Sequence, residues 1–259
     1  MMTSALTHTW YLSGRRLHAI ARQPFVIVGN VFQPAIWLFL FGQLFERVVE
    51  IPGFGGGSYL DYLIPGVIAM NAMNANMFAG MGTLDEIDRG TLNRFLVSPA
   101  SRVALMNANV VEQAVTTALQ SVIILLLGLL AGAELPGGLA GCATVVVAAV
   151  LVGIVFGSLS NAAGMLLRQR EAIIGIYIAF MLPVTFLSSA FMPTRLMPAW
   201  LRHVAAWNPL DWAVRAGRSA LGADPAWGEV AVRLGGLLAL AVVCVVVSVA
   251  TFRSYQKSV

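Results

Sequence analysis

Long apolar runs follow one another along this chain, and they limit what it can fold into. A lipid bilayer core takes about 20 apolar residues in helical form. Hydrophobic residues make up 58% of the 259 residues and charged residues only 11%, against about 25% charged in soluble proteins. Runs of bilayer length lie at 25–45, 62–84, 103–131, 139–167, 172–191 and 232–252. We therefore predict an all-α membrane protein with six transmembrane helices.

The first and last parts of the chain complete a single membrane domain, residues 1–259. Residues 1–24 place apolar side chains at helical spacing opposite three arginines, which predicts an amphipathic helix at the membrane interface. A frayed tail is the alternative. Spans one to five fill residues 25–189. They include a loop at 84–103, which we call the coupling loop because a soluble partner is expected to contact it. A short cytoplasmic tail at 253–259 follows span six.

Residues 190–231, between spans five and six, contain four of the six tryptophans, Trp200, Trp207, Trp212 and Trp227. Tryptophan favours the headgroup level of a bilayer, so we expect short outer or re-entrant helices in this segment. In the fourth span Gly153, Gly157 and Asn161 recur at every fourth residue, which predicts close approach of a second helix.

Arginines indicate the orientation, because basic residues are enriched in cytoplasmic segments. Six spans put both termini on one side, together with the loops after spans two and four. Ten of the sixteen basic residues fall on that side: Arg15, Arg16, Arg22, Arg89, Arg94, Arg102, Arg168, Arg170, Arg253 and Lys257. We expect both termini in the cytoplasm. Basic residues placed between apolar runs also argue against binding of nucleic acid.

The sequence has no Walker A loop, the glycine-rich loop that binds the phosphates of a nucleotide. Its single lysine is Lys257, close to the C-terminus, and no Walker A sequence surrounds it. Cys142 and Cys244 lie inside apolar runs without metal-ligand spacing, so we predict free thiols and no metal site. If transport is driven by ATP, a separate subunit must bind ATP and Mg²⁺; this chain itself is expected to bind no cofactor and to be no enzyme.

One polar stripe runs along the third span at helical steps, with Glu112 as its acid and Gln113, Thr116 and Gln120 beside it. A carboxylate inside a span can serve a proton or sodium relay, as in a self-sufficient carrier or channel driven by an ion gradient. A structural role, in which the stripe bonds to a neighbouring helix, is the preferred interpretation.

The charged stretch after the second span reads DEIDRGTLNRFLVSPASRVAL, residues 85–105. Acidic residues come first and basic residues follow, an order that is favourable in the dipole of a helix. The apolar residues of the stretch recur at steps of three and four, which is helical spacing. These features predict a short cytoplasmic helix that contacts a soluble partner, with an ordinary solvated loop as the alternative. The proposed contact residues are Asp85, Glu86, Asp88, Arg89, Gly90, Thr91, Leu92, Arg94 and Phe95.

The piece GTLNRFLVSPASRVAL resembles the cytoplasmic loop of ABC-2 type exporter permeases, particularly the daunorubicin-resistance group. FLSSAFMPTRLMPAWLRHVAAWNPLDWAVRAGRSAL resembles the family segment after the fifth span. Asn93 stands where the family often has an acid, and Ala100 where valine is common.

This resemblance implies a permease in a bacterial plasma membrane that pairs with a second, identical copy and binds two copies of a separate ATPase. It implies export of amphipathic drugs or lipids along a path lined by the first, second and fifth spans.

A methionine stripe on the second span is the candidate for the substrate path. Its side chains recur at steps of three and four, and methionine surfaces can repack around varied ligands. Packing within the protein is the competing interpretation. The stripe and its polar neighbour comprise Met70, Met73, Asn74, Met77 and Met81.

Overall fold

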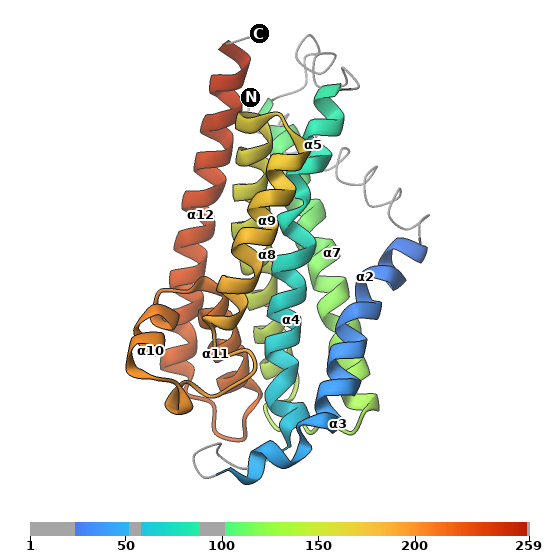
Figure 1. Ribbon diagram of the computed structural model, residues 1–259, viewed down its shortest axis with the longest axis vertical. Coiled ribbons are helices and arrows are strands. Elements are labelled where there is room, and N and C mark those ends of the chain that lie inside the picture. Colours follow the sequence, from blue (N-terminus) through green and yellow to red (C-terminus); the bar gives the residue numbers. More distant parts are fainter. Residues whose placement is uncertain (1–23, 52–57, 89–101, 258–259) are drawn as a thin grey trace.

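The protein is an elongated bundle of helices (Figure 1). The computed structural model describes residues 24–51, 58–88 and 102–257, and these residues contain no strand. The predicted N-terminal interfacial helix, residues 1–24, therefore lies almost entirely outside the described residues. An all-helical membrane domain agrees with the prediction from the apolar runs.

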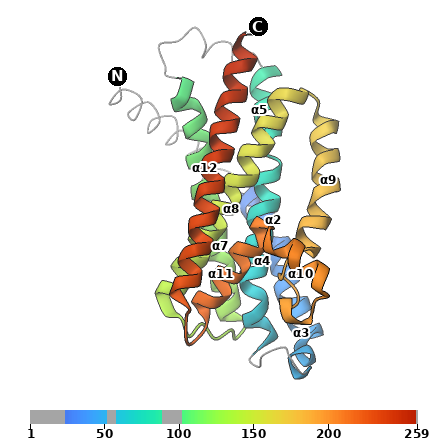
Figure 2. The ribbon, with the colours of Figure 1, turned by 90° about the vertical axis from the view of Figure 1, so that its left-hand side faces the viewer.

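Most of the long helices run along the bundle axis, while most of the short helices gather toward one end (Figures 1 and 2). In chain order the elements are α2 (Pro24–Ile36), the π-helix η1 (Trp37–Phe41), α3 (Gly42–Leu44), the 3-10 helix η2 (Glu46–Glu50), α4 (Tyr59–Met77), α5 (Ala79–Asp88), α7 (Arg102–Leu130), α8 (Gly138–Leu167), α9 (Arg170–Phe186), the 3-10 helix η3 (Thr194–Leu196), α10 (Ala199–Ala206), α11 (Pro209–Leu221) and α12 (Trp227–Lys257).

Helix α8 lies at the centre and packs against α4, α5, α7, α11 and α12. Small residues permit this: a Cβ at Gly153 would lie 2.7 Å from Asn76 Nδ2, and one at Gly157 would collide with the Gln113 side chain. Asn161 Oδ1 accepts a hydrogen bond of 3.0 Å from Thr83 Oγ1. The close helix approach predicted from the small residues is present.

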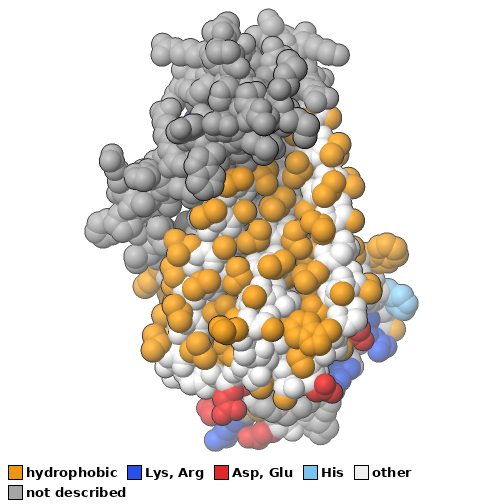
Figure 3. All heavy atoms as spheres, turned by 180° about the vertical axis from the view of Figure 1, so that it is seen from behind, with side chains coloured by type: hydrophobic (Ala, Val, Ile, Leu, Met, Phe, Trp, Pro, Cys, Tyr) orange, Lys and Arg blue, Asp and Glu red, His pale blue; other side chains and the backbone are white. Residues whose placement is uncertain are grey.

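Within the described part of the chain, three helices are long and apolar enough to cross a bilayer, at Asn109–Leu130, Gly138–Leu167 and Trp227–Phe252. With 30 residues, α8 is about 45 Å long, more than the roughly 30 Å of a hydrocarbon core. Hydrophobic side chains cover the face in Figure 3, and charged side chains gather at its lower end. This is the surface of a multi-pass membrane protein.

The remaining predicted spans are less regular. Span 25–45 is divided among α2, the π-helix η1 and α3, and span 172–191 is helical only to Phe186. Span 62–84 breaks at Phe78, between α4 and α5. There the Ser160 hydroxyl donates to the Met77 carbonyl and accepts from the Gly80 N–H at 3.0 Å. A side chain inserted into the helical ladder is a known cause of such a break.

Residues 190–231 form η3, α10 and α11, so the expected short helices are present. They lie at the end of the bundle where α4 begins (Figure 1). Helix α12 starts at Trp227, five residues before the predicted start of span six at residue 232.

Candidate functional site

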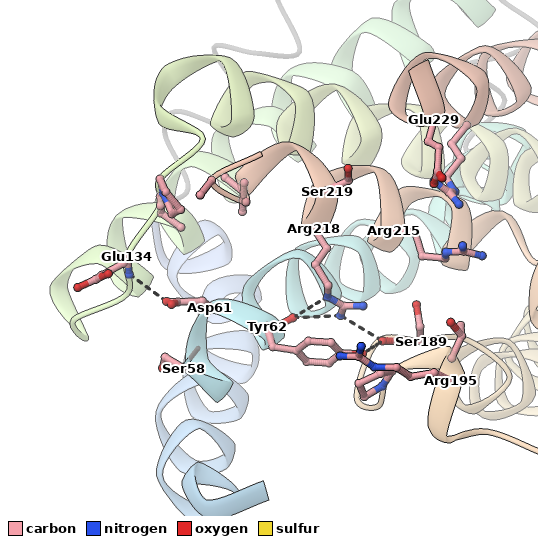
Figure 4. Close-up of a pocket in the computed structure, with 18 residues that line it drawn as sticks. Ser58, Asp61, Tyr62, Glu134, Ser189, Arg195, Arg215, Arg218, Ser219 and Glu229 are labelled. Atoms are coloured by element: carbon pink, nitrogen blue, oxygen red, sulfur yellow. Dashed lines mark hydrogen bonds and ion pairs between the residues drawn. The ribbon is translucent and has the colours of Figure 1, made fainter. Parts of the chain in front are cut away.

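A polar pocket of about 750 Å³ opens at the end of the bundle where α4 begins and α11 ends (Figure 4). This volume is typical of small-molecule sites. The pocket is lined from α4, the α7–α8 turn, the segment after α9, α11 and the start of α12: Ser58, Asp61, Tyr62, Glu134, Leu135, Pro136, Ser189, Pro193, Thr194, Arg195, Arg215, Arg218, Ser219, Leu221, Gly222, Ala223, Glu229 and Arg233.

Arg218 joins three parts of the fold in this pocket. Its guanidinium donates to the carbonyls of Tyr62, at 3.0 Å, and Ser189, at 3.1 Å. Its Cζ lies 3.4 Å from the centre of the Tyr62 ring, a cation–π contact. Burial lowers the pKa of Arg218 to about 10, so the group remains charged at neutral pH. Within the described residues its bonded partners are neutral groups, not carboxylates.

Asp211 is the buried acid beside this arginine. Its Oδ1 accepts the Ser189 N–H at 2.7 Å, and its Oδ2 lies 3.8 Å from Arg215. The Tyr62 hydroxyl donates to the Ser189 carbonyl at 2.9 Å. Ser189 is therefore held from three sides, and the segment after α9 has a fixed position against α4 and α11.

Acidic side chains form the other side of the pocket. Asp61 accepts the Glu134 N–H at 2.9 Å, which ties the first turn of α4 to the α7–α8 connection. Burial raises the pKa of the Asp61 carboxyl, while the hydrogen bond from Glu134 opposes this rise. In Figure 4 Asp61 and Glu134 lie on one side of Tyr62, with Arg195 and Arg215 on the other.

Asn208 explains how α11 is positioned. Its Oδ1 caps the helix by accepting the Leu210 N–H at 2.9 Å, and its Nδ2 donates to the carbonyls of Val184, at 2.7 Å, and Leu187, at 3.0 Å. Pro209 at the first helical position costs no hydrogen bond. The Asn-Pro-Leu sequence thus starts α11 and fastens it to the end of α9.

A second pocket, of about 710 Å³, is apolar and rich in aromatic side chains. Trp37 and Phe41 of η1 and Phe45, between α3 and η2, line it, and their rings follow one another with centroids 4.4 and 5.3 Å apart. Its other lining residues are Val48, Ile51, Tyr59, Phe186, Ser188, Phe191, Met192, Leu196, Met197, Pro198 and Leu201. We call it the aromatic pocket.

The predicted path residues lie elsewhere. Met70, Met73 and Met77 are buried in the main core, and Asn74 and Met81 are partly buried. None of these residues lines the polar pocket or the aromatic pocket. In the single chain the three buried methionines pack against neighbouring helices, and their role in a substrate path stays a prediction.

The polar stripe of the third span faces α4 and α8. Gln120 accepts from Asn71 at 3.0 Å, and Thr117 accepts from Asn76 at 2.9 Å. Gln113 lies against Gly157 of α8. Glu112 and Thr116 are partly buried on the same helix. Hydrogen bonds of this kind join neighbouring helices within a membrane.

The coupling residues are described only in part. Asp85, on α5, forms an ion pair with Arg170 at the start of α9. Glu86 and Asp88 lie in the last turns of α5. Arg89, Gly90, Thr91, Leu92, Arg94 and Phe95 fall outside the described residues.

Sequence reasoning missed both pockets. In the sequence Arg195, Arg215, Arg218 and Arg233 are four of the six basic residues outside the predicted cytoplasmic segments, and nothing local shows that they meet Asp61 and Glu134. The aromatic pocket did leave a signal, because Trp37, Phe41 and Phe45 recur at every fourth residue. Among the described residues no group of three or more His, Cys, Asp or Glu could hold a metal ion.

Comparison with known proteins identifies relatives of the whole domain. The model of the ABC-2 type transporter family matches residues 7–221. A daunorubicin resistance ABC transporter permease protein, DrrB1 of Streptomyces coeruleorubidus, is 28% identical over 228 residues, 85% of this chain and 75% of the relative. The probable doxorubicin resistance permease protein DrrC of Mycobacterium tuberculosis is 20% identical and covers 98% of this chain and 90% of its own length.

A putative transport permease, ycf38 of Cyanophora paradoxa, is 27% identical over 201 residues, 75% of this chain and 67% of the relative. The family match extends from the first residues to the end of α11 and so includes the residues of both pockets up to Leu221. The chain therefore belongs to the ABC-2 type transporter family, as a transmembrane permease subunit of an ABC exporter.

Proposed function

We propose that this permease moves amphipathic drugs or lipids out of the cytoplasm or the inner leaflet, using a separate ATPase subunit. The family match over residues 7–221 carries the proposal. The relatives named for daunorubicin and doxorubicin resistance support the class of substrate. In this proposal ATP and Mg²⁺ bind to the ATPase, because this chain has no Walker A sequence.

The proposed topology has six spans, with both termini in the cytoplasm of a bacterial cell and both pockets at the outer face. The course of α8 supports it: this helix begins beside the polar pocket and ends at Leu167, close to α5 and α9. The α5–α9 end carries Asp85, Arg170 and Glu171 and adjoins the coupling loop.

In the proposed assembly two permease copies bind two ATPases. The ATPase contacts Asp85 to Phe95, and α5 carries the resulting movement to α9 through the Asp85–Arg170 pair. We place the substrate path along the first, second and fifth spans. The aromatic pocket supports this placement because part of its lining comes from η1, the start of α4 and the end of α9, and the rest comes from η2, η3, α10 and the segments beside them.

The alternative, a carrier driven by an ion gradient through Glu112, has less support. Its neighbours on α7 take part in helix packing: Gln120 bonds to Asn71, and Gln113 lies against Gly157. Replacing Glu112 by Gln separates the two functions. An ATP-driven permease with this change should still transport its substrate. An ion-driven carrier should show pH-dependent transport in the parent chain and none in the variant.

Affinity purification in mild detergent tests the proposed function. The full chain should retain an ABC ATPase, with equal numbers of permease and ATPase copies. The double variant Arg89→Glu/Arg94→Glu should lose the ATPase while still inserting into the membrane, and the double variant Arg47→Glu/Arg202→Glu, on η2 and α10, is the charge-matched control. Purification of the parent chain without any ATPase would contradict the proposal.

A further inference from the structure

Positively and negatively charged side chains lie on different sides of the polar pocket. Arg218 lies over the ring of Tyr62, and Arg195 and Arg215 lie beyond it. Asp61 and Glu134 lie on the opposite side of Tyr62 (Figure 4). Two further charged residues, Arg233 and Glu229, pair with each other at 2.7 Å. A ligand that complements such a pocket carries an anionic group and a cationic group at different positions.

The arginine side suits an anion. The charge of Arg218 is held by two carbonyl oxygens and an aromatic ring, and Arg215 approaches Asp211 only to 3.8 Å. Guanidinium groups bind phosphate oxygens through two parallel hydrogen bonds, which gives both strength and orientation. Arg195 is exposed at the mouth of this side.

The acidic side suits an ammonium group. Glu134 is exposed, and Asp61 is held at the first turn of α4 by the Glu134 N–H. Both residues line the pocket on this side, so a cationic group placed there would be near two negative charges and favourably held.

The two pockets share a wall. Ser188 and Tyr59 line the aromatic pocket. Ser189, the next residue after Ser188, and Tyr62, one turn of α4 after Tyr59, line the polar pocket. The Tyr59 hydroxyl donates to the Phe191 carbonyl at 3.3 Å, and the rings of Tyr59 and Tyr62 stack with centroids 6.2 Å apart. A molecule with a charged headgroup and an apolar tail can therefore place the headgroup in one pocket and the tail against the other.

We propose that the polar pocket binds the zwitterionic headgroup of an amphipathic phospholipid, with phosphate at Arg195, Arg215 and Arg218 and the amine at Asp61 and Glu134. The lipid's apolar part lies along the aromatic pocket. This inference rests on the proposed function, because it names a class of molecule that the exporter handles at its outer face.

The test measures binding to the purified full-length chain in neutral detergent, without ATP. Dihexanoyl phosphatidylethanolamine is the zwitterionic probe, dihexanoyl phosphatidylglycerol carries the phosphate alone, and dihexanoyl glycerol carries no charge. Phosphoethanolamine tests the headgroup without a tail. We expect phosphatidylethanolamine to bind most tightly and dihexanoyl glycerol most weakly, with phosphoethanolamine weaker than the intact lipid.

Two exposed side chains allow matched variants that leave the core intact. Arg195→Gln should weaken both phospholipids by about fivefold, and Glu134→Gln should weaken phosphatidylethanolamine by about fivefold without affecting phosphatidylglycerol. The controls are Arg202→Gln on α10 and Glu50→Gln on η2, which line neither pocket and should bind as the parent does.

Equal binding of all probes, or variants indistinguishable from their controls, would overturn the inference. Phosphoethanolamine bound as tightly as the lipid would overturn the part assigned to the aromatic pocket. The measurement needs no ATPase, so its failure is separate from failure of the proposed function, which shows as loss of ATPase co-purification.

Discussion

Arg218 stacks on the ring of Tyr62 and also donates to the carbonyl of that same residue, with Cζ 3.4 Å from the ring centre and Nη2 3.0 Å from the oxygen. The same guanidinium reaches Ser189, which the Tyr62 hydroxyl also contacts. Two residues that lie 156 positions apart thus hold α4, α11 and the segment after α9 together.

Arg218→Lys should destabilise the protein by about 1–3 kcal/mol. Lysine keeps the charge but cannot present the planar fork that bonds to two carbonyls while stacking on a ring. Tyr62→Phe, which removes one hydrogen bond and keeps the ring, should cost about 1 kcal/mol. Thermal unfolding in detergent measures both changes, and a lysine variant as stable as the parent would contradict this account.

Asn208→Ala should destabilise by about 2–3 kcal/mol, since it removes a helix cap and two hydrogen bonds to the end of α9. Asn208→Asp keeps the capping oxygen but loses the donor, so its stability should fall between alanine and the parent. Thermal unfolding again provides the measurement. Equal loss in the two variants would show that the cap contributes nothing.

Gly80→Ala should cost about 1–3 kcal/mol, because the new methyl group would overlap the backbone of Ser160. Gly82 lies on the same helix, and a Cβ there would meet nothing within 4 Å. Gly82→Ala should therefore be neutral or stabilising by up to about 1 kcal/mol. Comparable stability of the two variants would show that α5 and α8 are not in close contact.

Asp85→Arg should reduce substrate-stimulated ATPase activity of the assembled transporter, because it opposes Arg170. Stability should change by less than about 1 kcal/mol, since both side chains are partly exposed. The exchange Asp85→Arg/Arg170→Asp restores the pair and should recover activity. A double variant as inactive as the single one would exclude a role for this pair in coupling.

A cysteine at Arg202 should react with a membrane-impermeant reagent in intact cells, whereas one at Arg94 should not. This outcome follows from the proposed orientation, with α10 outside and the coupling loop inside. The opposite labelling pattern would falsify the six-span topology.

The long helices were predictable because unbroken apolar runs fix their length. Helix α7 begins and ends within one residue of the predicted third span, and α8 does so for the fourth. The break at Phe78 was not predictable, since its cause is a hydroxyl from Ser160, 82 residues further along the chain. Local sequence carries no record of such a contact.

The polar pocket escaped prediction for a related reason. Its arginines come from α11, α12 and the segment after α9, while its acids come from α4 and the α7–α8 connection. Only the packing of α11 and α4 against α8 brings them together. The coupling residues were suggested by their charge pattern and by resemblance to known permeases, and of these the structure describes the environment of Asp85 alone.

Helix α9 is fastened at its start, its middle and its end. Arg170 pairs with Asp85 at its start, the ring of Tyr177 in its middle lies 4.3 Å from that of Phe78, and Asn208 holds the carbonyls of Val184 and Leu187 at its end. Between them large apolar side chains such as Ile178 and Phe180 are exposed. A helix of 17 residues is a stiff rod of about 26 Å. In the proposed assembly, a movement of α5 would therefore displace Phe186 at the far end of this rigid helix, and the aromatic pocket would change shape with each cycle of ATP hydrolysis.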